Sequence, residues 1–263
     1  MASKIAAQMY TLREFLKTPE GLADSLKKIS KIGYQAVQLS GVGCMNGEAP
    51  AVTAAQARRM LDDQGLRCIA THRAWAELLN NTPAEIDFHL ELGCNYVAIG
   101  SLPGEYKEAG AAGYRRFLQE AAPVIDQLNA AGLAFGYHNH SHEFCRTGQG
   151  RETLYDILIE EGAPKLQLEI DFYWVAHAGL NPERLVERCQ GRIPVVHVKD
   201  KEVIVKEGPV MAPVGEGNLD WAHLLPACHA AGTQWYAVEQ DKCLRDPFDC
   251  LRSSFEYLSA MGL

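Results

Sequence analysis

The sequence predicts a single (β/α)8 barrel, the TIM-barrel class, on three observations. Strand-like runs alternate with helix-like runs from one end of the 263-residue chain to the other. Parallel neighbouring strands need a crossover connection, so this alternation indicates a parallel sheet. Eight strand–helix units of about 33 residues each match the usual size of a closed (β/α)8 barrel. No composition break or linker divides the chain, so we expect one domain over residues 1–263.

The expected strands are short apolar runs, and glycines close the first helices. The strands are expected at residues 5–10, 36–39, 68–71, 96–100, 134–138, 166–170, 195–198 and 235–238. The helices are expected at residues 19–32, 51–64, 83–92, 114–131, 152–161, 182–189, 221–231 and 246–261. Gly33, Gly65 and Gly93 follow the first three helices, as is common at helix ends. Two long irregular stretches, 101–113 and 201–218, follow strands and would lie at the catalytic face of a barrel.

An open, doubly wound sheet is the competing fold, and it usually carries a glycine-rich phosphate turn after its first strand. Here residues 8–13 (QMYTLR) contain no glycine. Glycines follow the second strand in GVGCMNG, but Asn46 takes the third position of the dinucleotide fingerprint. The closed barrel is therefore the better prediction.

Composition and charge exclude several classes of protein. The chain is 47% hydrophobic and 22% charged, with a net charge of −8, which is typical of a globular domain. An acidic surface repels phosphate backbones and anionic lipids, so we expect neither nucleic acid nor membrane as a partner. The eight cysteines are scattered without a CxxC pair, and residues 1–4 lead into the first strand without an apolar signal region. We therefore expect reduced thiols and a cytoplasmic location.

Carboxylates and imidazoles gather at the ends of the last four expected strands, where the active site of a barrel lies. Glu143 follows strand five, Asp171 ends strand six, His197 lies in strand seven and Glu239 follows strand eight. Three carboxylates and an imidazole converging on one opening would need a cation to relieve their repulsion. Oxygen donors with one nitrogen favour Mn²⁺, with Mg²⁺, Co²⁺ or Zn²⁺ as alternatives.

Each member of this predicted metal set also has a purely structural interpretation. Asp171 alone can be a helix N-cap, His197 a core histidine, and Glu239 part of a solvated edge. Glu143 lies beyond the expected strand end, so His138 or His140 can take its place as a ligand. His138, His140 and His142 would share one face if the strand continued, and one of them can serve as a base.

Several ordered segments of the chain resemble one family of enzymes. These segments are YHNHSHEF, EIDFYWVAHAG, VHVKDKE, PVGEGNLDW and AVEQD, together with residues 8–13 and 68–72. The set resembles the sugar phosphate isomerase/epimerase superfamily with xylose-isomerase-like barrels, in a branch marked by HNHxxEF. The resemblance covers nearly the whole chain and places Asp171, His197 and Glu239 on the family's metal-binding positions.

The same resemblance also shows two departures from the family pattern. Many epimerases have a histidine three residues after the aspartate of strand six, where this chain has Trp174. Their strand-five glutamate aligns near His138, whereas this chain offers Glu143 five residues later. The placement of the catalytic base is therefore expected to differ in this branch.

The resemblance implies a divalent-metal-dependent isomerase or epimerase acting on a keto-sugar or related polyol. It would remove a proton next to a carbonyl through a metal-stabilised enediolate. Candidate catalytic residues are Glu143, Glu239, His138 and His140, and candidate substrate-binding residues are His72, Lys199 and Trp174. Glu169 shares the inward parity of Asp171 and is expected to support the site, and a homodimer is a possible assembly for such barrels.

Three other functions compete with this one. A metal-dependent lyase or dehydratase could eliminate a β-substituent from a 3-keto-glycoside or inosose with the same residues. A sugar-binding barrel without catalysis is disfavoured by the intact Asp171, His197 and Glu239. A DNA repair endonuclease of the same superfamily would need a basic surface, and the net charge of −8 argues against it.

Overall fold

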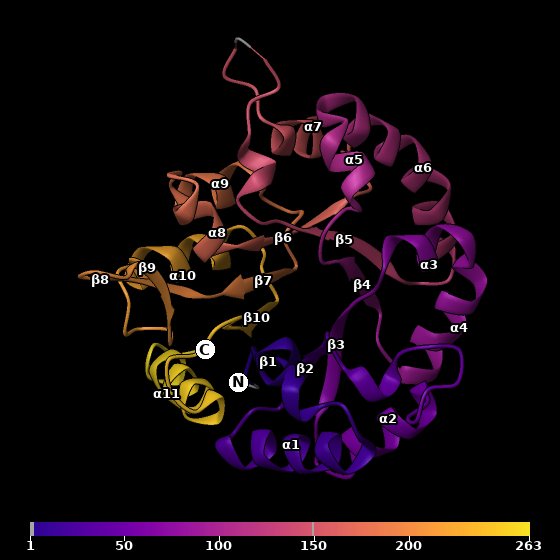
Figure 1. Cartoon of the computed structure of the whole chain (residues 1–263), viewed down its shortest axis with the longest axis vertical. Coiled ribbons are helices and arrows are strands. Elements are labelled where there is room, and N and C mark those ends of the chain that lie inside the picture. Colours follow the sequence, from indigo (N-terminus) through magenta and orange to yellow (C-terminus); the bar gives the residue numbers. More distant parts are fainter. Residues whose placement is uncertain (1–2, 149) are drawn as a thin grey trace.

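Eight parallel strands close into a barrel in the order β1-β10-β7-β6-β5-β4-β3-β2, with helices forming a ring around it (Figure 1). The computed structural model describes residues 3–148 and 150–263. The predicted (β/α)8 fold class is confirmed. Residues 1–2, part of the segment without a signal region, lie outside the described residues.

The barrel strands are short, and nearly all their residues are buried. They are β1 (Ile5–Gln8), β2 (Ala36–Leu39), β3 (Arg67–His72), β4 (Tyr96–Ile99), β5 (Ala134–His138), β6 (Gln167–Asp171), β7 (Val195–Val198) and β10 (Trp235–Val238). The helices are α1 (Pro19–Ile32), α2 (Ala54–Asp62), α3 (Trp75–Asn80), α4 (Thr82–Leu92), α5 (Gly104–Glu108), α6 (Gly110–Ala130), α7 (Leu154–Glu160), α8 (Phe172–His177), α9 (Pro182–Arg188), α10 (Trp221–Ala230) and α11 (Pro247–Ala260).

Local sequence explains where the first helix begins and ends. The Thr18 side chain accepts a hydrogen bond from the backbone of Gly21, and Pro19 occupies the first turn of α1, where its missing N–H costs nothing. The helix ends at Gly33, whose backbone φ of +124° is rarely adopted by residues that carry a side chain. A Cβ at Gly33 would lie 2.6 Å from the ring of Phe255, so glycine also allows α11 to pack closely.

The barrel interior changes from apolar to polar along the strands. Alternate residues point inward, and those nearer the strand starts include Ala6, Ala36, Ala70, Ala98 and Ala237, which pack with Tyr96. The next inward position on most of these strands, two residues closer to the C-terminal end, is polar: the residues there include Gln8, Gln38, His72, His197 and Glu239. Small residues therefore fill the N-terminal half of the barrel, and polar side chains gather at its C-terminal end.

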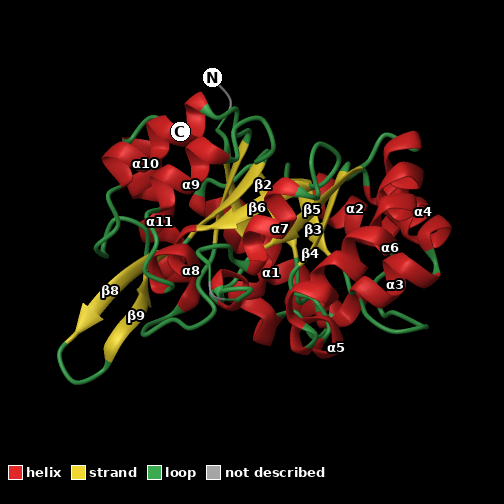
Figure 2. Cartoon of the chain, turned by 90° about the horizontal axis from the view of Figure 1, so that it is seen from above, coloured by secondary structure: helices red, strands yellow, loops and turns green. Residues whose placement is uncertain are grey.

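The two stretches expected to be irregular contain regular structure, which corrects the prediction. Residues 201–218 include most of an antiparallel hairpin of β8 (Asp200–Ile204) and β9 (Gly208–Ala212), which extends away from the barrel (Figure 2). Residues 101–113 contain α5 and the start of α6. Short helices and a half-exposed hairpin lack the long hydrophobic period that identifies an element in sequence. No helix in the described ranges is both long and apolar enough to cross a membrane.

The loop that follows the hairpin is held by one buried carboxylate. Asp200 is fully buried, and its oxygens accept hydrogen bonds from the backbone of Gly215, Gly217 and Leu219 and from the indole of Trp221 at 2.6 Å. A Cβ at Gly217 would lie 2.3 Å from Asp200 Oδ1. This carboxylate therefore fixes the chain between β9 and α10.

We expect Asp200→Ala to lower the free energy of unfolding by about 3 kcal/mol, because the buried indole of Trp221 and three backbone N–H groups lose their acceptor. Chemical denaturation measures this change. The control is Asp220→Ala at an exposed site, which should change stability by less than about 0.5 kcal/mol. Equal effects of the two substitutions would contradict the role given to Asp200.

Candidate metal and active site

Four neighbouring barrel strands bring together two imidazoles and two carboxylates. His138 ends β5, Asp171 ends β6, His197 lies in β7, and Glu239 directly follows β10. One ligand atom from each lies within 4.8 Å of the others, and all four residues are buried. Asp171 and His197 are paired in register on adjacent strands. Three of the four residues predicted as metal ligands thus meet at the C-terminal mouth of the barrel.

Among the described residues, Glu143 belongs to a different group, with His140 and His142. It lies in a 3-10 turn, His142–Phe144, after β5 has ended. Its oxygens accept hydrogen bonds from the Tyr137 hydroxyl at 2.9 Å and from the backbone of His140 at 2.8 Å. The strand-five position next to Asp171 is held by His138, the alternative left open by the sequence.

Asp171 combines the structural role expected of an N-cap with membership of the cluster. Its Oδ1 accepts a hydrogen bond from the backbone of Trp174 at 3.0 Å and so caps α8. Its Oδ2 is buried and lies 2.9 Å from the ammonium of Lys199, whereas the unpartnered Nδ1 of His138 faces Glu169 Oε2 at 3.6 Å. Asp171 Oδ2 and His138 Nε2 lie 4.0 Å apart, so a carboxylate oxygen and an imidazole nitrogen, both common metal ligands, can reach one divalent cation.

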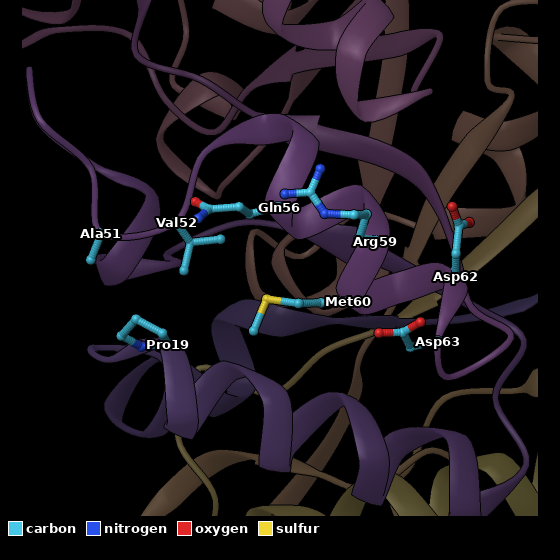
Figure 3. Close-up of a pocket in the computed structure, with 8 residues that line it drawn as sticks. All are labelled: Pro19, Ala51, Val52, Gln56, Arg59, Met60, Asp62 and Asp63. Atoms are coloured by element: carbon cyan, nitrogen blue, oxygen red, sulfur yellow. The ribbon is translucent and has the colours of Figure 1, made fainter.

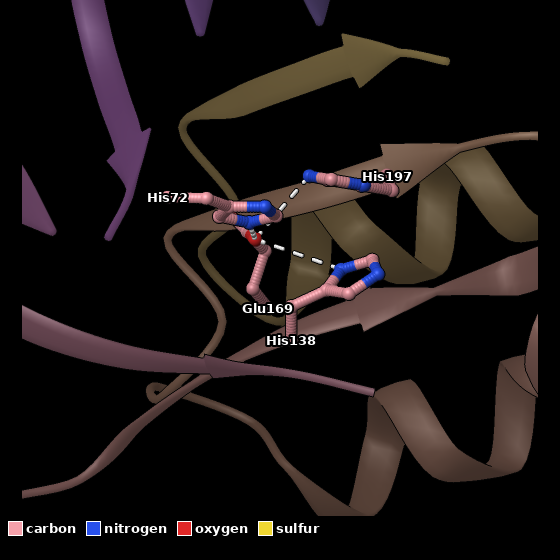
Figure 4. Close-up of side chains that lie close together, drawn as sticks. All are labelled: His72, His138, Glu169 and His197. Carbon is pink, nitrogen blue, oxygen red and sulfur yellow. Dashed lines mark hydrogen bonds and ion pairs between the residues drawn. The ribbon is translucent and has the colours of Figure 1, made fainter. Parts of the chain in front are cut away.

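Glu169 lies beneath the cluster and faces three imidazoles (Figure 4). Its Oε2 is 2.5 Å from His72 Nε2, 3.2 Å from His197 Nε2 and 3.6 Å from His138 Nδ1. Its Oε1 accepts a hydrogen bond from the Gln38 amide at 2.9 Å. The carboxylate is completely buried, so these neighbours supply the donors that water would otherwise provide.

Two buried glutamines fix the orientation of the ligands. The Gln38 amide nitrogen donates to Glu169, so the Gln38 oxygen, 2.9 Å from His197 Nε2, accepts a hydrogen bond from the N–H of that nitrogen. This leaves His197 Nδ1, 2.9 Å from Glu239 Oε2, as the atom that points into the cluster. Gln8 donates to Glu239 Oε1 at 3.0 Å. Sequence reasoning assigned no role to either glutamine, although a glutamine within an apolar strand was a readable signal.

Burial and charge shift the pKa values of the cluster in opposite directions. Burial raises the pKa of Asp171 to about 6, although Lys199 and His197 oppose the rise. Burial alone would also raise the pKa of Glu239, but Lys199 and His197 hold it well below its usual range. Burial lowers the pKa of His138 well below normal, so that imidazole is neutral. A neutral imidazole can bind a metal or accept a proton.

The remaining shifts reflect the same balance. Burial alone would lower the pKa of His197, but Glu169 and Glu239 raise it to about 10. Burial opposes ionisation of Glu169, yet His197 and His72 lower its pKa to about 2. Burial lowers the pKa of His140 to about 4 despite the opposing charge of Glu143. The site therefore pairs ionised carboxylates with a cationic His197. The imidazoles of His138 and His140 beside them are neutral.

A cavity of about 440 Å³ opens above the cluster. Its lining is polar and aromatic and consists of Tyr10, Ser40, His72, Gly100, His138, His140, Trp174, Met211, Glu239 and Asp241. His72 and Trp174, both predicted to contact substrate, line it. Lys199 is only 1% exposed and lies just beneath, with its ammonium between the carboxylates of the cluster.

Two other cavities lack such a gathering of chemical groups. One of about 420 Å³ lies between α1 and α2, lined by Pro19, Met60 and exposed charged side chains (Figure 3). Another, of about 710 Å³, lies at the N-terminal ends of the strands and is lined by Arg67, Gln167 and Trp235, among others. In a barrel the chemistry belongs to the C-terminal end, where the cluster lies.

A family model described as the xylose isomerase-like TIM barrel matches residues 26–260. The chain therefore belongs to the xylose isomerase-like TIM barrel family. A search of curated proteins found no significant match.

Solved structures with the same fold cover nearly the whole chain. A sugar phosphate isomerase/epimerase from Parabacteroides distasonis has 22% identity and a TM-score of 0.81, covering 100% of this chain and 96% of its own. An L-ribulose 3-epimerase has 14% identity and a TM-score of 0.73, with coverage of 98% and 94%. The IOLI protein with a bound zinc atom has 17% identity and a TM-score of 0.72, with coverage of 98% and 97%. At these identities the likeness concerns the fold.

We expect Glu169→Gln to weaken divalent-metal binding about 10- to 100-fold, because partners that orient ligating histidines contribute on this scale. Titration of chelator-treated protein with Mn²⁺ measures the change. Glu187→Gln, at an exposed position in α9, is the matched control and should bind Mn²⁺ like the parent. Unchanged affinity in the Glu169 variant would show that this carboxylate does not support the ligands.

Proposed function

We propose that this chain is a divalent-metal-dependent isomerase or epimerase of a keto-sugar or related polyol, which removes a proton next to a carbonyl. The observation that carries the proposal is the convergence of His138, Asp171, His197 and Glu239 beneath a cavity of about 440 Å³. Family membership agrees with it, since solved structures of this fold include proteins described as a sugar phosphate isomerase/epimerase and an L-ribulose 3-epimerase.

His138, Asp171, His197 and Glu239 would hold the metal. A divalent cation bound there, with Mn²⁺ as our first choice for a set of mixed oxygen and nitrogen donors, supplies a Lewis acid that polarises a substrate carbonyl. Glu169 and Gln38 hold His197 with Nε2 protonated, so Nδ1 is the atom that would coordinate the cation after losing its proton. Glu143 is not part of this proposed set, because among the described residues it groups with His140 and His142 and not with Asp171.

Proton transfer falls to groups that line the cavity. The His140 imidazole is neutral, and its ring lies 5.4 Å from that of Trp174. Glu239 remains ionised through its contacts with His197 and Lys199. We propose His140 and Glu239 as the two groups that remove and return the proton. Glu143 accepts a hydrogen bond from the backbone N–H of His140. It therefore acts as a positioning residue for His140.

Substrate binding would use the aromatic and polar walls of the cavity. Trp174 offers an indole face of the kind that packs against sugar rings. His72 lines the opening with its Nδ1 3.3 Å from Ser40 Oγ, so both can contact a hydroxyl group. These contacts suit a small polyol better than a polymer, because the cavity holds only about 440 Å³.

Elimination from a 3-keto-glycoside or inosose is the second candidate function. It is favoured by the number of imidazoles around the cavity, since His72, His138 and His140 all line it. A neutral imidazole that has gained a proton can pass it to a leaving group. Both reactions begin with the same proton removal, and they differ in the product.

We expect incubation with Mn²⁺ in D₂O and a panel of ketoses, inososes and 3-keto-glycosides to place deuterium at one carbon of one substrate class. Mass spectrometry and NMR of the products would locate it and distinguish epimerisation, isomerisation and elimination. Chelator-treated protein without added metal is the control and should exchange no deuterium. Exchange with no substrate of the panel would contradict the proposed function.

We expect Asp171→Asn and Glu239→Gln each to lower turnover by at least about 100-fold, since each removes a charged ligand and the bound cation contributes several kcal/mol to the reaction. Metal content and activity are measured together on each purified variant. Asp220→Asn, at an exposed site, should leave both unchanged. Full metal content together with full turnover in both ligand variants would show that the site is wrongly assigned.

A further inference from the structure

Lys199 is an unusual neighbour for a metal site. It lies in the chain two residues after His197, and its side chain is 1% exposed. Its Nζ is 2.9 Å from Asp171 Oδ2, 2.7 Å from Glu239 Oε2 and 2.9 Å from Asp241 Oδ2. An ammonium buried among three carboxylates is fully paired, and removing either side of such a pair is costly.

Two of these contacts use the atoms that a metal needs. Asp171 Oδ2 also lies 4.0 Å from His138 Nε2 and 3.9 Å from His197 Nδ1, and Glu239 Oε2 lies 2.9 Å from His197 Nδ1. A dication bound by the same two oxygens would lie within a few ångströms of the ammonium, and like charges at that separation repel strongly in a buried site. The ammonium and the cation therefore compete for the same oxygens.

Asp241 gives the ammonium a second position. It lies outside the proposed ligand set, lines the cavity, and is 29% exposed. The guanidinium of Arg13 donates to its backbone carbonyl at 2.9 Å, which holds this segment in place. A lysine side chain has several rotatable bonds, so Nζ can keep Asp241 while leaving the other two carboxylates.

The donor set itself makes this competition effective. It contains two carboxylates, Asp171 and Glu239, because an imidazole, His138, holds the strand-five position. One ammonium therefore offsets half of the formal negative charge that the set offers to a dication. A third carboxylate in place of His138 would leave a larger excess of negative charge for the metal.

We propose that Lys199 is a built-in competitor of the divalent cation, which neutralises Asp171 and Glu239 in the metal-free protein and retreats to Asp241 when the cation binds. This inference rests on the proposed metal site and adds a determinant of its affinity. It makes the metal-free protein stable and the metal exchangeable. Lys199 acts here as a positioning residue, through Asp171 and Glu239.

The test measures Mn²⁺ affinity and metal-free stability of Lys199→Met in the full chain. Methionine is similar in length and carries no charge. We expect chelator-treated Lys199→Met to bind Mn²⁺ at least tenfold more tightly than the parent, measured by calorimetry. Its melting temperature without metal should be lower than that of the parent, and saturating Mn²⁺ should raise it by a larger amount. Lys242→Met, at an exposed position near the opening, loses the same charge and should change the affinity less than twofold.

Lys199→Gln covers the case in which the methionine variant does not fold without metal, because glutamine can still donate a hydrogen bond to a carboxylate. Either variant that folds only when Mn²⁺ is present supports the proposal. Affinity equal to or weaker than that of the parent in both variants overturns it. Asp171→Asn separates this failure from a failure of the proposed function: if it binds Mn²⁺ as well as the parent does, the metal site itself is wrong, and both proposals fall.

Discussion

Charge balance at the C-terminal end of the barrel is the constraint on which the rest of the site depends. Asp171, Glu169 and Glu239 are almost completely buried, and a buried carboxylate must find cations or hydrogen-bond donors. His197 and Lys199 supply the cations, while Gln8 and Gln38 supply donors. The same arrangement holds Asp171 Oδ2 and His138 Nε2 4.0 Å apart, a spacing at which both can reach one divalent cation.

The lower half of the barrel makes this polar layer possible. Alanines occupy most inward positions there, and Tyr96 fills the space between them. A Cβ at Gly136 would lie 1.9 Å from the hydroxyl of Tyr96, so only glycine at that position of β5 admits the ring. Small residues on one level and one large ring thus keep the interior filled, as close packing demands, while the level above carries charge.

The loops at the mouth are held by buried polar contacts that lie apart from the cluster. Asp200 accepts hydrogen bonds from backbone N–H groups in residues 215–219. Glu143 accepts hydrogen bonds from the Tyr137 hydroxyl and from the backbone of His140, just after β5. Glu143 was predicted to be catalytic from its position, yet both carboxylates accept hydrogen bonds from backbone N–H groups of the neighbouring loops. A carboxylate near an active site can therefore serve the fold, and only its partners reveal which role it has.

The sequence by itself determined the barrel and three of the four residues in the cluster. Strand periodicity and strand ends are local properties, so Asp171, His197 and Glu239 could be placed at the mouth from their positions alone. The tertiary structure decided that His138 completes the group, that Glu143 turns away from it, and that Lys199 lies between two carboxylates. Those outcomes depend on where β5 ends, on the 3-10 turn after it and on side chains from strands far apart in the chain. No local pattern records such distances, because they are set by how the closed barrel brings its strand ends together.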